Sequence, residues 1–219
     1  MVERYKTVYR QAEAEITEKK SRFIAVAAPV RTEAEALDLI NAVKKKHWNA
    51  SHNVFAYHVG LERETRRMSD DGEPGGTAGL PMLDVLRGEN LKNTLVVVTR
   101  YFGGTLLGTG GLIRTYARAA KEGVAAASVV EKALYAKLAV TVDYHLSGKV
   151  QHAALKNNQF IRDTVYADNV VFQLLVESGF CAAFTETITD ITGGTAVVRP
   201  DGFAYGFFHE GELKVEPVS

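Results

Sequence analysis

A glycine-rich segment between an apolar run and a helical pattern constrains the fold of this chain more than any other feature. The segment is LVVVTRYFGGTLLGTGGLIRTYARAA, residues 95–120. The short β-branched run at 95–98 predicts a strand that is buried on both faces. From Leu112 onward, apolar residues recur at helical spacing. Between them stand five glycines: Gly103, Gly104, Gly108, Gly110 and Gly111.

The order strand, glycine loop and helix suits the binding of an anion. A helix N-terminus offers free N–H groups and the positive end of its dipole, and glycines let the backbone come close to a ligand. We therefore predict a phosphate group as the ligand. The segment is no known nucleotide fingerprint, because Gly-Lys-Ser/Thr is absent and Ile113 stands where the dinucleotide pattern has its third glycine. A loop that only lets the helix pack close to the sheet explains the composition equally well.

Charge is distributed unevenly along the chain. The net charge is zero, which argues against a protein that coats nucleic acid indiscriminately. Residues 1–133 nevertheless hold 20 Lys and Arg against 16 Asp and Glu, and residues 134–219 hold 6 against 10. We interpret this asymmetry as two domains with different surfaces, 1–133 and 134–219.

Cysteine usage and hydropathy predict a cytoplasmic protein without a membrane partner. The single cysteine, Cys181, cannot form an internal disulfide and is expected to be a small buried core residue. No apolar run approaches the roughly 18 residues of a membrane span, and the charged N-terminus lacks a signal-peptide core.

A basic turn and a helix precede the glycine segment. Residues 11–30 predict two strands around a turn at Lys19 and Lys20, and these lysines with Arg22 form either a solvated turn or a partner contact. Thr32 and Glu35 form a capping box for a helix to about residue 46.

His52 lies near the start of a predicted strand over residues 51–59, whose period of two places His52 and His58 on one face. The two histidines are too far apart to chelate one metal without a third ligand, so packed or surface histidines are the simpler interpretation. His52, near the strand start, is the better functional candidate.

An acidic loop follows, SDDGEPGGTAGLP at residues 69–81. Its carboxylates, Asp70, Asp71 and Glu73, can bind Mg²⁺ or act as acid and base, but such residues more often fix a tight turn by accepting hydrogen bonds. We expect Thr77 to cap a short helix over residues 82–86.

The helix after the glycine loop carries Arg114, Arg118 and Lys121 at i, i+4 and i+7. With Arg100, this stripe forms either a basic patch for phosphates or an ordinary solvated helix flank.

The second half has a different pattern. Strands at 134–144, 161–167, 170–178 and 195–208 and helices at 145–158 and 180–192 give the order βαββαβ of the ferredoxin-like motif. We find no chemistry there, and interpret this half as a docking platform.

Three strings carry a resemblance: EKKSRF at 18–23, SDDGEPGGTAGLPML at 69–83 and RYFGGTLLGTGGLIRTY at 100–116. With the βαββαβ pattern, they make the chain resemble the bacterial two-domain members of the YigZ/IMPACT family. The resemblance implies an α+β protein. Its N-terminal domain would share the fold of a ribosomal-protein domain, of domain IV of elongation factor G and of the GHMP kinases. Its C-terminal domain would be ferredoxin-like and resemble domain V of elongation factor G.

The resemblance also bears on function. The eukaryotic IMPACT regulator acts on translation through a kinase-activating partner, which it meets through an extra N-terminal domain. Since this chain starts at the shared domain, that mechanism is not carried over.

Three hypotheses follow. In the first, a translation-associated regulatory protein contacts RNA or the ribosome without a cofactor and is no enzyme; a regulatory protein partner would fit the same role. The residues of its binding site are Lys20, Arg22, His52, Arg100, Tyr101, Gly103, Gly104, Gly108, Gly110, Gly111, Arg114 and Arg118. In the second, an enzyme acts on a phosphorylated small molecule or nucleotide, with Mg²⁺ or a base at Asp70, Asp71 or Glu73. In the third, the chain is a protein-binding adaptor. No sequence position identifies a catalytic residue.

Overall fold

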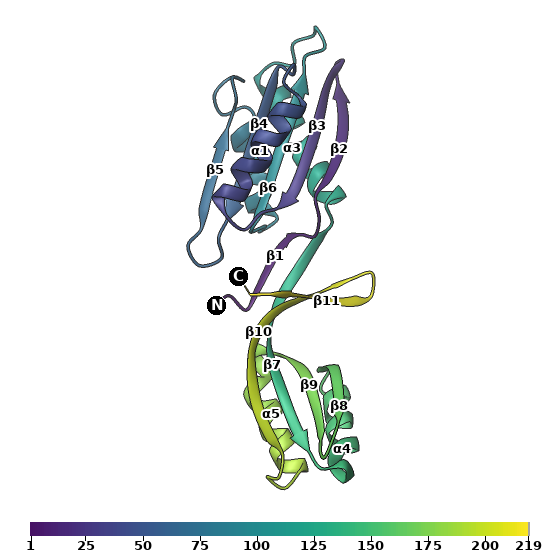
Figure 1. Cartoon of the computed structure of the whole chain (residues 1–219). Helices are drawn as coiled ribbons and strands as arrows, with labels where there is room; N and C mark the ends of the chain where they lie inside the picture. Colours follow the sequence, from purple (N-terminus) through teal and green to yellow (C-terminus); the bar gives the residue numbers. More distant parts are fainter. Residues whose placement is uncertain (219) are drawn as a thin grey trace. The chain divides into compact units, whose positions relative to one another are not determined.

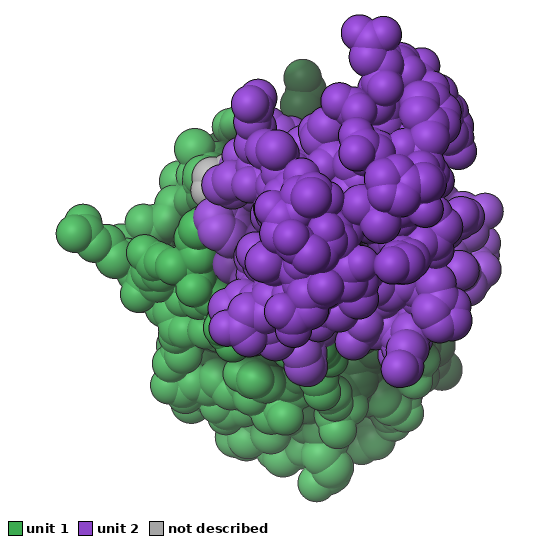
Figure 2. All heavy atoms as spheres, turned by 90° about the horizontal axis from the view of Figure 1, so that it is seen from below, with its two compact units in different colours: residues 1–131 green, residues 132–219 purple. Residues whose placement is uncertain are grey.

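The computed structural model describes residues 1–218 and divides the chain into two compact units, residues 1–131 and 132–219, which Figure 2 shows in different colours. Each unit is described by itself.

The first unit is built on a five-stranded antiparallel sheet (Figure 1). From one edge to the other, its strands are β2 (Ala12–Glu18), β3 (Ser21–Pro29), β6 (Thr94–Tyr101), β4 (His52–Val59) and β5 (Thr65–Ser69). The central strand β6 contains the predicted apolar run and pairs with β3 and β4 along its length. Its burial on both faces confirms the interpretation of residues 95–98.

Helices cover both faces of this sheet. Helix α1 (Glu33–Lys46) packs on one face, against Leu95 and Val97 of β6. Helices α2 (Gly79–Gly88) and α3 (Thr109–Ala126) pack on the other, against Val96 and Val98. This alternation follows from the period of two along a strand.

The predicted cap of α1 is confirmed. The Oγ1 atom of Thr32 accepts the N–H of Glu35 at 3.2 Å, while a carboxylate oxygen of Glu35 accepts the N–H of Arg31.

The second unit confirms the ferredoxin-like prediction. In chain order, its elements are β7 (Val129–Val142), α4 (Tyr144–Lys156), β8 (Phe160–Tyr166), β9 (Val170–Glu177), a 3₁₀ turn at Ser178–Phe180, α5 (Cys181–Ile191), β10 (Val197–His209) and β11 (Glu212–Pro217). The antiparallel order β10-β7-β9-β8 places the fourth, first, third and second strands of the motif side by side. Strand β11 extends the sheet beyond β10, whereas β1 (Arg4–Val8) belongs to the first unit.

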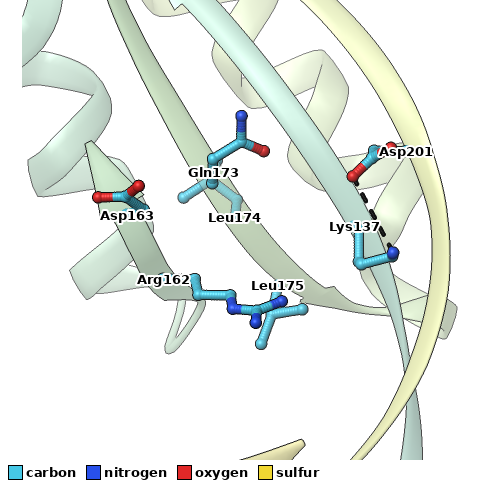
Figure 3. Close-up of a pocket in the computed structure, with 7 residues that line it drawn as sticks. All are labelled: Lys137, Arg162, Asp163, Gln173, Leu174, Leu175 and Asp201. Atoms are coloured by element: carbon cyan, nitrogen blue, oxygen red, sulfur yellow. Dashed lines mark ion pairs between the residues drawn. The ribbon is translucent and has the colours of Figure 1, made fainter. Parts of the chain in front are cut away.

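The two faces of the second sheet differ. Leu138 and Val140 of β7 pack with Phe172 and Leu174 of β9 against α4 and α5. On the opposite face, Lys137 of β7 and Gln173 of β9 line a shallow hollow of about 350 Å³, together with Arg162 and Asp163 of β8 and Asp201 of β10 (Figure 3). There the ammonium group of Lys137 lies 4.0 Å from a carboxylate oxygen of Asp201.

The burial of Cys181 differs from expectation. Cys181 is only partly buried, because it is the first residue of α5 and packs at the margin of the core. In residues 1–218, every helix is too short or too polar to cross a bilayer.

Candidate functional site

The topology of the first sheet brings the sequence motifs to one end. Because β6 is antiparallel to both β3 and β4, its last residues lie beside the first residues of those strands. Tyr101 pairs with Arg22 of β3, and Arg100 pairs with His52 of β4. We call this the Arg100 end of the sheet. The β2–β3 turn, the acidic loop and the glycine loop all lie there.

Backbone contacts tie the glycine loop to its neighbours. The N–H of Gly103 donates to Oγ of Ser21 at 3.1 Å, and that of Phe102 donates to Oγ of Ser51 at 3.2 Å. A Cβ atom on Gly103 would lie 2.0 Å from the carbonyl carbon of Lys20. Gly103 therefore permits close approach of another part of the chain, rather than of a ligand.

The glycine loop is shorter than the sequence indicated. Gly104 and Gly108 have φ values of +82° and +75°, which favour glycine. Helix α3 starts at Thr109, so Gly110 and Gly111 belong to its first turn and not to the loop. The loop thus ends directly at the N-terminus of α3, as the anion-binding interpretation requires.

Asp70 stabilises the start of α2. One of its carboxylate oxygens accepts the N–H groups of Ala78 and Gly79 at 3.1 and 2.8 Å, and the other accepts that of Gly76 at 2.9 Å. The prediction that Thr77 caps a helix over residues 82–86 was wrong, because its hydroxyl donates to the carbonyl of Pro74. Asp70, at the start of the acidic loop, performs this function instead.

Asp71 fixes the acidic loop to two other elements. Its carboxylate accepts the N–H of Asn53 at 2.7 Å and pairs with the ammonium group of Lys44 at 2.7 Å. Its carbonyl oxygen lies 2.9 Å from Nδ1 of His52. A carbonyl can only accept, so Nδ1 of His52 carries the proton, and in the neutral ring Nε2 is left as the basic nitrogen.

Glu73 is buried in an ion pair. Its Oε1 atom lies 2.6 Å from Nη1 of Arg100 and accepts the hydroxyl of Tyr116 at 2.7 Å. The side chains of Glu73 and Arg100 are only 3% and 6% exposed. Burial, followed by the hydrogen bond to Glu73, raises the pKa of Tyr116, so its phenol stays protonated and acts as a donor. Nε2 of His52 lies 3.8 Å from the same Oε1 atom.

The charge of Arg100 is thus already balanced. Its guanidinium carbon lies 5.4 Å from the ring centre of Phe23 and 5.5 Å from that of Phe102, and its Nε atom is buried without a hydrogen-bond partner. The first hypothesis from the sequence has Arg100 offer its charge to a phosphate. The structure instead places it in an internal network, because Glu73 reaches it from the acidic loop.

The acidic and glycine loops converge at a hollow of about 480 Å³. Polar groups of its wall come from His52, Glu73 and Arg100, and apolar ones from Phe102, Leu106 and Leu112. Asp70 and Asp71 do not line it. Among residues 1–218, no group of three or more His, Cys, Asp or Glu side chains is arranged to hold a metal ion.

A second hollow, of about 310 Å³, is basic. Lys19, Arg114 and Arg118 line it together with Glu18. Arg118 lies 3.5 Å from the Glu18 carboxylate, whereas Lys19 and Arg114 form no ion pair with any described residue. The hollow therefore presents two uncompensated cations beside the first turns of α3.

The β2–β3 turn holds its lysines in an uncommon backbone conformation. The φ values of Lys19 and Lys20 are 43° and 67°, as in a type I′ hairpin turn. Asparagine and glycine usually occupy such positions, because a Cβ atom disfavours positive φ.

An aromatic cluster occupies the face of the Arg100 end that α1 covers. The hydroxyl of Tyr101 lies 2.9 Å from Nδ1 of His47, and the guanidinium of Arg22 lies 5.3 Å from the centre of the Tyr101 ring. Arg22 also pairs with Glu15 at 3.1 Å. Burial lowers the pKa of His47, and nearby Lys46 adds to this effect.

Comparison with known proteins shows the family to which the chain belongs. The Impact N-terminal domain matches residues 19–124, and a domain of unknown function, DUF1949, matches residues 140–195. The IMPACT family member YvyE of Bacillus subtilis is 42% identical over 94% of this chain and 94% of its own length. The chain belongs to the IMPACT family.

A second family member and two solved structures are also similar to this chain. YigZ of Escherichia coli is 30% identical over 81% of this chain and 88% of its own. A crystal structure described as that of a hypothetical protein covers 90% of this chain and 97% of its own, with 27% identity and a TM-score of 0.59. A structure of the two-domain translational regulator Yih1 covers 55% of this chain and 46% of its own, with 27% identity and a TM-score of 0.36.

The structure also shows residues that sequence patterns did not single out. Tyr116 is a buried partner of Glu73, His47 supports Tyr101, and Trp48 stands in the loop before β4 with 82% of its surface exposed. Only Trp48 carried a local signal, as the single tryptophan of the chain, directly after a basic helix end.

Proposed function

We propose that this IMPACT-family protein is a translation-associated regulatory protein that contacts RNA, free or in the ribosome, through the basic hollow at the Arg100 end. The observation that carries the proposal is the exposed position of Lys19, Lys20 and Arg114 without a carboxylate partner. The assignment to translation comes from the family resemblance and from the elongation-factor folds that it implies.

The first turn of α3 adds to the attraction for phosphate. The first N–H of α3 that has a helical acceptor is that of Leu112, which donates to the carbonyl of Gly108. The N–H groups of the preceding residues of the turn have no helical acceptor, and no side chain caps them. These groups and the helix dipole favour an anion beside the basic hollow.

The acidic loop does not oppose this binding. Each of its carboxylates is balanced internally: Asp70 by three backbone N–H groups, Asp71 by Lys44 and Glu73 by Arg100. A phosphate at the neighbouring hollow therefore meets little net negative charge, although three acidic residues stand nearby in the sequence.

Binding should be local and sensitive to salt. The net charge of the chain is zero, so no long-range field supports association, and the contacts at the hollow supply it. Each contact to a phosphate releases counterions, and the logarithm of the binding constant falls by about 0.7 per decade of salt for each contact to a single strand.

The test is co-sedimentation with ribosomes and binding of a labelled 12-nucleotide single-stranded RNA, both over a salt series. The variant Lys19→Glu/Arg114→Glu should bind RNA more weakly. The slope of the logarithm of its binding constant against the logarithm of the salt concentration should be shallower by about 1–1.5. Arg63→Glu is the matched control, since Arg63 is an exposed residue just beyond the opposite end of β4. No association at low salt, or equal losses in both variants, would overturn the proposal.

A second candidate function rests on the convergence of the acidic and glycine loops. The 480 Å³ hollow combines apolar walls with a few polar groups, as small-molecule sites do. As the second candidate, we propose that this protein is an enzyme that acts on a phosphorylated small molecule or nucleotide and holds its phosphate at the start of α3. Nε2 of His52 would then accept a proton.

This second candidate is tested with a panel of nucleotides and sugar phosphates. A ligand of the hollow should raise the unfolding temperature of the wild type, and His52→Ala should abolish its turnover while retaining binding. If no compound stabilises the protein and none is consumed, this candidate is refuted.

A further inference from the structure

Trp48 is a large aromatic side chain that the fold leaves in water. It is 82% exposed, and it makes no hydrogen bond, ring stacking or cation–π contact with any described residue. Single exposed aliphatic residues are common, but a tryptophan ring exposes far more apolar surface than they do. Nothing in its own unit requires the ring at this position.

The backbone around Trp48 is held in place. The N–H of His47 donates to the carbonyl of Val43 at 2.9 Å, and the N–H of Ala50 donates to the carbonyl of His47 at 3.0 Å. The side chain of Asn49 accepts the hydroxyl of Tyr101 at 3.3 Å. The turn therefore presents the ring from a supported loop, which lowers the entropic cost of binding a partner.

The surroundings of Trp48 are basic and polar. Lys45 is exposed without a carboxylate partner, and Arg22 lies over Tyr101 in the neighbouring cluster. A docking site for an apolar protein surface would instead need several contiguous apolar side chains. Arg22 is already paired with Glu15, so Lys45 is the cation left to meet a phosphate, and an exposed aromatic ring beside such a cation can stack a nucleic-acid base.

We propose that Trp48 stacks on an unpaired base of single-stranded RNA at the Arg100 end. This inference rests on the proposed RNA-binding function and names the class of RNA. A base pair in a duplex has both faces covered by its neighbours, whereas a base in a loop or single strand exposes a face to an aromatic side chain. The site accepts any base, because every base has a π-face.

The chain offers a direct measurement of this contact. Trp48 is its only tryptophan, so intrinsic fluorescence excited at the indole reports on this position alone. Titration with a 12-nucleotide oligouridylate should quench the emission. A 12-base-pair RNA duplex should bind the basic hollow without quenching it.

Variants separate stacking from charge. Trp48→Ala should weaken binding of the single strand about fivefold to a hundredfold, and leave duplex binding unchanged. Trp48→Phe should restore most of the affinity. Leu37→Ala is the matched control, because Leu37 is a half-exposed apolar residue on α1 and is expected to have no effect.

The outcomes distinguish this inference from the proposed function. If single strand and duplex bind with salt dependence but emission is unchanged and Trp48→Ala binds normally, stacking is refuted while the basic hollow stands. If neither RNA binds at low salt, the proposed function fails and stacking fails with it. If emission responds only to a purified protein partner, Trp48 belongs to a protein interface and the inference is overturned.

Discussion

Removing the charge of Glu73 should destabilise the first unit strongly. Glu73→Gln keeps an acceptor for the hydroxyl of Tyr116 but leaves Arg100 charged and buried, with an Nε atom that already lacks a partner. Breaking a buried ion pair in this way costs about 3–5 kcal/mol. For a unit of 131 residues, that loss corresponds to a fall of about 11–18 °C in its unfolding temperature.

The double variant Glu73→Leu/Arg100→Met provides the sharper test. Replacing both members of a buried pair with apolar groups removes the desolvation cost as well as the attraction. We therefore expect the double variant to be more stable than Glu73→Leu or Arg100→Met alone, so that the losses of these two single variants do not add.

Calorimetry of the full chain measures these effects. The transition of the first unit should shift, and that of the second should not. Asp84→Asn is the control, because the Asp84–Arg87 pair is exposed and should contribute less than about 1 kcal/mol. A loss below about 1 kcal/mol for Glu73→Gln, or additive single losses, would refute the assignment of a buried charged pair.

Three further predictions follow from local geometry. Lys19→Asn/Lys20→Gly should raise the free energy of unfolding by about 1 kcal/mol, since both positions have positive φ, and urea titration measures this effect. The same variant should weaken RNA binding in the RNA assay, because it removes two cations. Gly103→Ala should cost about 3 kcal/mol or more in urea titration, because its Cβ would overlap the backbone of Lys20; an unchanged midpoint would contradict that contact. His47→Phe should flatten the pH dependence of the free energy of unfolding. Because folding lowers the pKa of His47, its contribution to stability is complete above about pH 6.5 and is lost as the pH falls from there toward the folded pKa. Identical pH profiles of variant and wild type would show that His47 is not the source of this pH dependence.

Local patterns were sufficient for most of the regular elements. Residues 95–98 form the central strand because a continuous β-branched run suits a strand covered on both faces, and Thr32 caps α1 through atoms only three residues apart. Strands β1, β5 and β11 were not predicted. Their sequences RYKTV, TRRMS and ELKVEP contain too few apolar residues to show a buried face, and their pairing partners stabilise them instead.

Whether a site residue is exposed or paired depends on partners that lie far away in the sequence. An arginine after a buried strand can be exposed or paired, and only the position of Glu73 in space decides this for Arg100. Asp70 likewise caps a helix that begins nine residues later, a spacing that no local capping rule covers. The sequence could therefore indicate which loops meet, but not how their charges are balanced.

The central position of β6 has a consequence for biosynthesis. Strands β3 and β4 do not pair with each other, and each completes its hydrogen bonds on the last of the five strands to be synthesised. The nascent chain must therefore extend past Tyr101 before the sheet can close, and past Tyr116 before Glu73 acquires both of its partners. A fragment that ends before Thr94 should be unstable and prone to aggregation, since the edges of β3 and β4 that β6 covers would have no partner.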